Sequence, residues 1–175
     1  MAPPSADFGS VVINMSSANT TFTVSNPGSA PTGMLSTALG GADAAHFAIT
    51  SDGCAGQVLA GGGSCTLTAR FSPTTMGQKN ATLSVTPTGS STTTSTLTGM
   101  GLMPGEITMS PPARDFGSLP QGDTTGTPFS FTVTNGGQAA TGSLVVSLTG
   151  GDASHFSITS NGCMGMTLAA AASCM

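Results

Sequence analysis

Residues 41–65 read GADAAHFAITSDGCAGQVLAGGGSC, and residues 150–174 read GGDASHFSITSNGCMGMTLAAAASC. The landmarks of the first stretch return 109 residues later, as His46 does at His155 and Cys54 at Cys163. A constant offset of this kind defines the folding unit of a repeat protein. The 175-residue chain therefore contains one complete unit and a second copy that ends one residue after its second cysteine, Cys174.

Short stretches on both sides of the repeat alternate apolar and polar residues, as at Phe22 and Val24. Such alternation is typical of half-buried β-strands. Turn-forming residues, including Asn26-Pro27-Gly28, separate the stretches. Short strands with frequent turns predict a β-sandwich. The alternating stretches are 21–25, 66–71, 81–86 and 129–134, with shorter candidates at 11–15, 34–39, 47–50 and 95–98.

The repeat and the strand pattern together predict the domain organisation. We expect an all-β protein made of two tandem immunoglobulin-like β-sandwiches. The first, 1–101, is complete, and the second, 113–175, is partial and lacks its last strands. Between them, 102–112 carries several prolines and a glycine and is typical of a short, fairly stiff linker.

Composition excludes several classes of function. Only 6% of the residues are charged, and Arg70, Lys79 and Arg114 are the only lysines and arginines. No basic patch can form from so few cations, so nucleic-acid binding is excluded. No apolar run is long enough for a membrane span. No signal peptide is visible at the start, which indicates that one was removed or that the sequence is a fragment.

Four cysteines allow three disulfide connectivities. The repeat favours Cys54 with Cys65 and Cys163 with Cys174, because each copy then closes the same loop. Disulfides persist in oxidising compartments, so this pairing predicts a secreted protein. The alternative is two pairs of free thiols in a cytosolic protein. The spacing is unlike that of a zinc knuckle.

Several motifs, read in order, resemble a known family. They include Asp7-Phe8-Gly9, Phe22-Thr23-Val24-Ser25-Asn26 and Arg70-Phe71-Ser72-Pro73, and the likeness covers 6–101 and continues through Cys174. The chain resembles the immunoglobulin-like repeats of bacterial choice-of-anchor D surface proteins, relatives of abnormal-spindle, Hydin and major-sperm-protein domains. The resemblance implies a seven-stranded sandwich in a secreted or surface-attached multidomain protein, usually without catalysis. The second copy departs from the pattern because it lacks the last strands.

The two histidines recur with an aspartate three residues earlier, as His46 with Asp43 and His155 with Asp152. One histidine and one aspartate in each copy do not make a closed metal site. We interpret the aspartate as the cap of a short turn. Hydrolase chemistry needs a nucleophile, a base and an orienting group, and the only glutamate, Glu106, lies in the predicted linker. We therefore predict no catalytic, cofactor or metal site, and no enzyme activity.

The incomplete second copy would expose the inner face of its sandwich. Burying one such apolar side chain is worth about 1.5–3 kcal/mol, so the face needs a cover. Three explanations stay open. The chain is a fragment, or a neighbouring chain supplies the strands in a head-to-tail assembly, or this copy is ordered only within an assembly. The residues of the face are Phe131, Val133, Leu144, Val146, Phe156 and Ile158.

These observations predict a non-catalytic extracellular or cell-surface structural module, acting as a spacer, an adhesive or a fibre-forming unit. Its partner is expected to be protein, including copies of itself, with strand complementation between copies as one route. The alternative is an accessory ligand- or carbohydrate-binding module of a larger secreted protein. The chain has no Trp and no Tyr, the residues that usually stack on sugars, which counts against carbohydrate binding.

Overall fold

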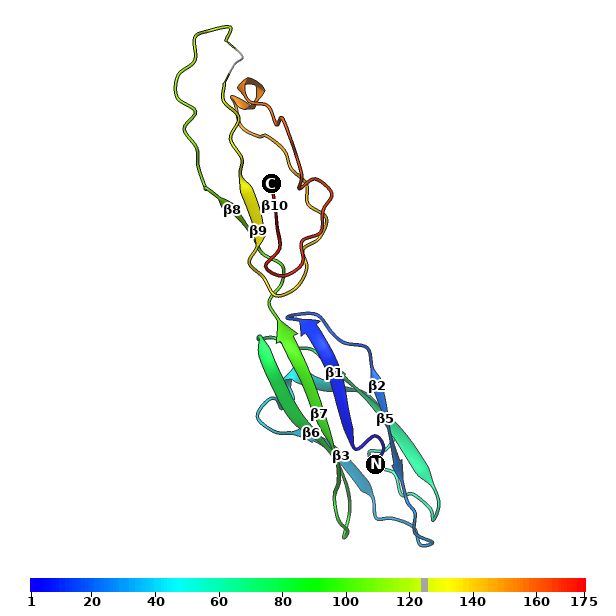
Figure 1. Cartoon of the computed structure of the whole chain (residues 1–175). Helices are drawn as coiled ribbons and strands as arrows, with labels where there is room; N and C mark the ends of the chain where they lie inside the picture. The colour runs from blue at the N-terminus through cyan, green and yellow to red at the C-terminus, as the bar shows by residue number, and fades with distance from the viewer. Residues whose placement is uncertain (124–125) are drawn as a thin grey trace. The chain divides into compact units, whose positions relative to one another are not determined.

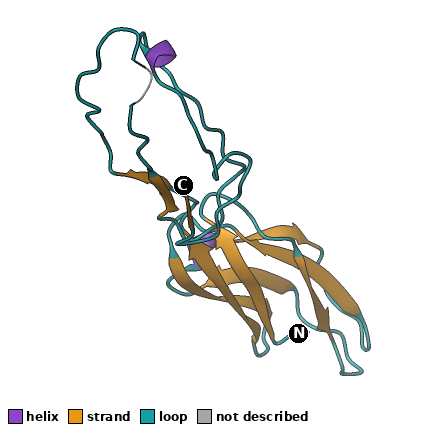
Figure 2. Ribbon diagram, turned by 45° about the horizontal axis from the view of Figure 1, so that its top comes forward, coloured by secondary structure: helices purple, strands orange, loops and turns teal. Residues whose placement is uncertain are grey.

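The computed structural model describes residues 1–123 and 126–175, and the chain divides into two compact units. Unit 1 is Met1–Leu102 and unit 2 is Met103–Met175. Apart from two single 3-10 turns, η1 (Ala44–His46) and η2 (Ala153–His155), the described secondary structure consists of β-strands (Figures 1 and 2). The predicted all-β class is confirmed.

Unit 1 contains two β-sheets, drawn in orange in Figure 2. One has the strand order β1-β7-β6-β3 and the other the order β2-β5-β4. Strand β1 runs parallel to β7, and the other neighbouring strands of unit 1 are antiparallel. The strands are β1 (Ser5–Val12), β2 (Thr20–Ser25), β3 (Leu35–Gly40), β4 (Phe47–Asp52), β5 (Ser64–Phe71), β6 (Gly77–Pro87) and β7 (Thr93–Leu102).

The core of unit 1 lies between the two sheets and follows the alternation in the sequence. Along the central parts of β2, β5, β6 and β7 every second side chain is buried, because successive side chains point to opposite faces. Leu83 and Leu97 are fully buried on one sheet, and Phe22 and Leu67 on the other. The buried apolar set is Phe22, Val24, Leu35, Phe47, Cys54, Leu59, Leu67, Ala69, Phe71, Ala81, Leu83, Val85 and Leu97.

Unit 2 has a smaller sheet with the antiparallel order β10-β9-β8. Its strands are β8 (Ile107–Ser110), β9 (Thr132–Asn135) and β10 (Ser173–Cys174). Strand β8 lies inside 102–112, so the prediction that this whole stretch is a linker was wrong. Within this stretch only Ile107–Met109 alternate apolar and polar residues, and prolines flank them. Pairing with β9 nevertheless makes these residues part of a strand.

The rest of unit 2 contains fewer strands than the repeat predicts. In unit 1, β3 pairs with β6 and β4 pairs with β5. The counterparts of β3 and β4 are 144–149 and 156–161, and neither is a strand. In unit 1 their partners lie in β5 and β6, and the counterparts of those partner residues lie past Met175, outside the sequence described. Neither segment is paired in a sheet, although Leu144 donates its backbone N–H to Met166 and accepts that of Gly165.

Candidate functional site

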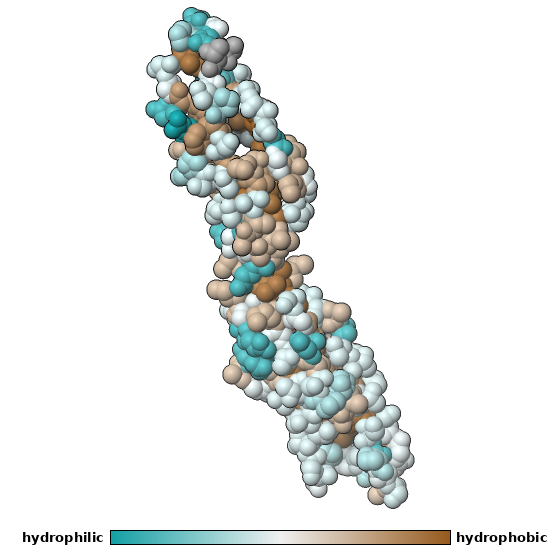
Figure 3. Space-filling model, in the orientation of Figure 1, coloured by the Kyte–Doolittle hydropathy of each residue, from teal (hydrophilic) through white to brown (hydrophobic). Residues whose placement is uncertain are grey.

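The candidate site is the apolar face of unit 2, which we call the open face and define by the six residues predicted from the sequence. Phe131, Val133, Leu144 and Val146 are half-buried, whereas Phe156 is 51% exposed and Ile158 is 44% exposed. Figure 3 shows brown and tan residues scattered among paler ones on the visible side of unit 2. These side chains therefore remain in contact with solvent in the chain as described.

Unit 1 shows how the same face looks when it is covered. Phe47, the counterpart of Phe156, is only 5% exposed, and its ring centroid lies 4.9 Å from that of Phe71. Phe8 contacts Phe47 from another side, at 5.8 Å. Unit 2 repeats that second contact between Phe116 and Phe156, at 5.9 Å. The counterpart of Phe71 would lie past Met175, outside the residues that the structure describes.

Each unit contains one disulfide, and the two disulfides lie at equivalent positions of the repeat. Cys54 pairs with Cys65, and Cys163 pairs with Cys174, as the repeat predicts. Both pairs have a Cα–Cα distance of 5.3 Å, and neither cysteine pair includes a free thiol. Each disulfide joins a loop to a strand: Cys54 to β5 in unit 1, and Cys163 to β10 in unit 2.

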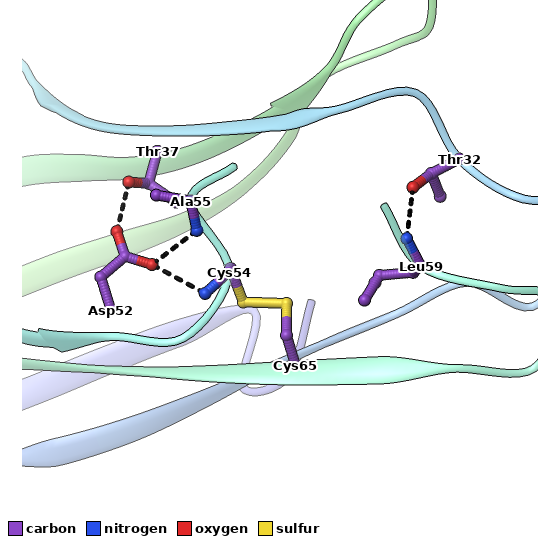
Figure 4. The surroundings of a disulfide bond; sticks show 7 residues. All are labelled: Thr32, Thr37, Asp52, Cys54, Ala55, Leu59 and Cys65. Atoms are coloured by element: carbon purple, nitrogen blue, oxygen red, sulfur yellow. Dashed lines mark hydrogen bonds between the residues drawn. A yellow bond between two sulfur atoms is a disulfide. The ribbon is translucent and has the colours of Figure 1, made fainter. Parts of the chain in front are cut away.

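Asp52 organises the loop that leads into the first disulfide (Figure 4). Its carboxylate accepts hydrogen bonds from the backbone N–H groups of Cys54 and Ala55, both at 2.9 Å, and from the hydroxyl of Thr37. Burial raises the pKa of the Asp52 carboxyl, but these hydrogen bonds outweigh that effect and hold the pKa below its ordinary value.

Unit 2 builds the same loop without a charge. Asn161 takes the place of Asp52, and its amide oxygen accepts the N–H groups of Cys163 and Met164 at 3.0 and 2.9 Å. Val146 takes the place of Thr37. Unit 2 therefore lacks both the hydroxyl that donates a hydrogen bond in unit 1 and the carboxylate that accepts it. The replacement also adds an apolar side chain to the open face.

The side chains of His46 and Asp43 bind different backbone groups and not each other. The Nδ1 atom of His46 accepts the backbone N–H of Thr74 at 3.2 Å. Asp43 accepts the backbone N–H of Asn80 at 3.0 Å, and Lys79 Nζ lies 3.9 Å from it. The prediction that Asp43 caps the turn η1 was wrong, since its side chain makes no cap hydrogen bond. Both side chains instead hold the chain that follows β5.

The second pair, Asp152 and His155, occupies the same positions beside η2. Within 1–123 and 126–175, neither side chain makes a hydrogen bond or an ion pair. The described residues also contain no cluster of three or more His, Cys, Asp or Glu side chains that could hold a metal ion.

One residue with a defined structural role was missed at the sequence level. The Nδ2 group of Asn26 donates to the carbonyls of Ala30, Leu59 and Ala60, at 2.8 to 3.1 Å, and its Oδ1 accepts the N–H of Gly28. Asn135 repeats this arrangement in unit 2 and is fully buried. The signal in the sequence was that this asparagine recurs 109 residues later. Asparagine followed by Pro-Gly or Gly-Gly indicates a turn, but it does not predict buried hydrogen bonds of the side chain.

The two-sheet sandwich of unit 1, with its loop cross-linked to a strand, defines an immunoglobulin-like β-sandwich protein. Residues 1–100 match the family described as "HYDIN/CFA65/VesB-like, Ig-like domain", and the chain belongs to this family. No curated protein matches the chain. None of the described helices is long and apolar enough to cross a membrane.

Two solved structures are similar to the chain. The ASH/PapD-like domain 7 of human CEP192 has a TM-score of 0.41 and 15% identity, over 57% of this chain and 82% of that one. The secreted serine protease VesC from Vibrio cholerae has a TM-score of 0.42 and 18% identity, over 78% of this chain and 33% of that one. Similarity at this level is too low to indicate a function.

Proposed function

We propose that the chain is a non-catalytic structural module, extracellular or at the cell surface, that acts through protein–protein contacts. The observation that carries the proposal is the open face of unit 2. Phe156 and Ile158 are exposed there, whereas their counterparts Phe47 and Ile49 pack in or against the core of unit 1. Contiguous apolar side chains that lie in water are typical of surfaces that bind a partner.

A polypeptide fits this face better than a small molecule does. The segments 144–149 and 156–161 carry backbone N–H and C=O groups that are not paired in a sheet. A partner strand supplies main-chain hydrogen bonds and apolar side chains at the same time, and this is how β-strand addition gives both affinity and specificity. Strand complementation is therefore the mode of contact that we favour.

The disulfides support the extracellular setting. All four cysteines are paired in the structure, and such bonds persist in oxidising compartments. The resemblance to choice-of-anchor D surface proteins points in the same direction. The low content of charged residues, 6%, favours close packing between modules, because few ions must be desolvated. A spacer, adhesive or fibre-forming role follows from these properties.

Site-specific photocrosslinking tests the proposal. A photoreactive phenylalanine analogue replaces Phe156 in one variant and Val58, an exposed apolar residue of unit 1, in the control. Each variant is irradiated as purified chain and in the presence of the secreted and surface fractions of the producing cells. We expect adducts of protein mass from position 156 and none from position 58. A lack of protein adducts from position 156, together with binding on a glycan array, would overturn the proposal in favour of a carbohydrate-binding module.

A further inference from the structure

The loop that leads into the second disulfide contains an asparagine–glycine pair, Asn161-Gly162. In such a pair the backbone nitrogen of the glycine can attack the side-chain amide of the asparagine, because glycine has no Cβ to block the approach. The sequence contains one other pair of this kind, Asn135-Gly136. The two asparagines lie in opposite environments, so the structure decides which of them can react.

Asn135 is protected by its surroundings. Its side chain is fully buried, and its Nδ2 group donates to the backbone carbonyls of Ala139, Leu168 and Ala169 at 2.8 to 3.1 Å. Loss of ammonia from this side chain would leave all three carbonyls without their donor, which is costly inside a folded unit. We therefore expect no reaction at Asn135.

Asn161 is accessible. Both Asn161 and Gly162 are exposed. Within 1–123 and 126–175 the Nδ2 group of Asn161 makes no hydrogen bond, so ammonia can leave into solvent without breaking a contact. This exposure belongs to the loop itself, because Asp52 and Gly53, the counterparts in the two-sheet sandwich of unit 1, are exposed as well.

The side-chain carbonyl of Asn161 is also activated. Its Oδ1 atom accepts the backbone N–H groups of Cys163 at 3.0 Å and Met164 at 2.9 Å. Two N–H donors directed at one carbonyl oxygen stabilise the negative charge that develops there when a nucleophile adds to the carbon. The counterparts of these donors hold the carboxylate of Asp52 in unit 1, so the loop also accommodates the acid that the reaction produces.

The fold requires a residue without a side chain after Asn161. A Cβ at Gly162 would lie 2.7 Å from the carbonyl oxygen of Met175, and one at Gly53 would lie 2.9 Å from that of Thr66. The N–H of Gly162 donates to the same Met175 carbonyl at 2.8 Å, and this hydrogen bond must open before the nitrogen can attack. Because Gly162 is exposed, we expect it to open by local fluctuation, without unfolding of unit 2.

We propose that Asn161 is a site of spontaneous deamidation in the folded chain. The nitrogen of Gly162 loses its proton and adds to Cγ of Asn161, the bond from Cγ to Nδ2 breaks, and ammonia leaves a succinimide ring. Water then opens the ring. Cleavage of the bond from Cγ to the Gly162 nitrogen gives aspartate, whereas cleavage of the bond from the backbone carbonyl carbon gives isoaspartate. The net change consumes water and releases ammonia, and nothing is oxidised or reduced.

Deamidation gives unit 2 the carboxylate that unit 1 has at Asp52. It adds a negative charge to a chain whose formal net charge is −4. The N–H groups of Cys163 and Met164 bind the oxygen on Cγ, so they favour attack of water at Cγ and hence aspartate. The inference goes beyond the proposed function and does not depend on it, because the reaction needs no partner.

Peptide mapping by mass spectrometry tests the inference on the full chain, kept folded in mildly alkaline buffer with its disulfides intact. We expect the peptide that contains Asn161 to convert progressively to a product with the mass of the acid, and the peptide that contains Asn135 to stay unchanged. The Asn161→Gln variant, whose longer side chain disfavours closure of the ring, is expected to show no conversion at this position.

A synthetic peptide of residues 156–168, with its cysteine alkylated, shows how the same sequence reacts without the fold. We expect a larger share of aspartate from the folded chain than from the peptide, because only the fold directs the two N–H donors at the carbonyl. No conversion of Asn161 in the folded chain, under conditions in which the peptide reacts, would overturn the proposal. Equal conversion at Asn135 would overturn it as well, and equal product ratios would overturn the role of the two donors. None of these results changes the outcome of photocrosslinking at position 156.

Discussion

The rings of Phe47 and Phe71 lie 4.9 Å apart in the core of unit 1, whereas Phe156, the counterpart of Phe47, contacts Phe116 at 5.9 Å and is 51% exposed. The same side chain is therefore part of a core in one copy and part of a surface in the other. The difference arises from the partner strands and not from the side chain. It predicts different costs for removing a phenylalanine of the covered core and one of the open face.

Replacement of Phe71 by alanine is expected to lower the free energy of unfolding of unit 1 by about 3–5 kcal/mol, as for other buried phenylalanines. Phe71 is fully buried and its ring also lies against Gly99, where an added Cβ would be 2.7 Å from the ring. Phe156→Ala is expected to cost less than about 1 kcal/mol because half of that side chain is already in water. Urea denaturation followed by circular dichroism measures both, and equal losses would contradict the account.

Loss of the Asn26 amide is expected to destabilise unit 1 by about 2 kcal/mol, because one buried and two part-buried carbonyl hydrogen bonds lose their donor. The variant is Asn26→Ala. The control is Asn80→Ala, whose side chain is exposed and whose replacement should change stability by less than about 0.5 kcal/mol. Urea denaturation measures the midpoint of unfolding of both variants. Equal midpoints would contradict the stabilising role of Asn26.

Removal of the first disulfide is expected to lower the stability of unit 1 by roughly 2–3 kcal/mol. The bond joins cysteines separated by 11 positions, and a short closed loop restricts the unfolded chain by about this amount. The Cys54→Ala/Cys65→Ala variant can be compared with the parent chain by thermal unfolding. An unchanged melting temperature would show that the loop is held by Asp52 and the core alone.

The Asp52 carboxyl gives unit 1 a stability that depends on pH. Its folded-state pKa is lowered, so the ionised form favours the folded state. That contribution is present above the unfolded pKa of about 4 and is lost as the pH falls through the folded pKa. The side chain is exposed, so solvent screening limits the effect to less than about 1 kcal/mol.

The Thr37→Val variant tests this dependence, because it removes the hydroxyl that donates to Asp52 and introduces the valine that unit 2 has at Val146. Removing the hydroxyl is expected to raise the pKa of Asp52, as followed by NMR titration of its carboxyl. Asp52→Asn, the residue present at Asn161, is expected to remove this component of acid sensitivity from unit 1. An unchanged Asp52 pKa in Thr37→Val would mean that the backbone N–H groups alone lower it.

Much of unit 1 could be predicted from the sequence, because its alternation reports directly which side chains are buried. Phe22 and Val24, or Leu83 and Val85, lie on the buried faces that the pattern indicates. The disulfide pairs could be predicted from the repeat. The buried positions follow from the alternation within one strand, and the disulfide pairs follow from a comparison of the two copies.

The features that were missed depend on pairing between distant residues. Strand β8 lies between Pro104 and Pro111 in a stretch with little alternation, and it exists because β9 pairs with it. The segment 129–134 alternates well, yet β9 begins only at Thr132, because the residues before it lack a partner. Asp43 was expected to cap its own turn, but its acceptor oxygen is used by Asn80, 37 residues away.

Hydrogen–deuterium exchange of the chain 1–175 tests the central claim, that unit 2 presents an open face, most directly. It compares the same two segments in both units: β3 and β4 of unit 1, and 144–149 and 156–161 of unit 2. We predict that the amides of β3 and β4 exchange slowly, because they are paired in sheets. Apart from Leu144 and Phe156, whose N–H groups bond to Met166 and Ala153, their unit 2 counterparts are expected to exchange close to the rate of an unstructured chain. Equal protection of the two sets would contradict the account, since it would mean that the chain covers this face with its own residues.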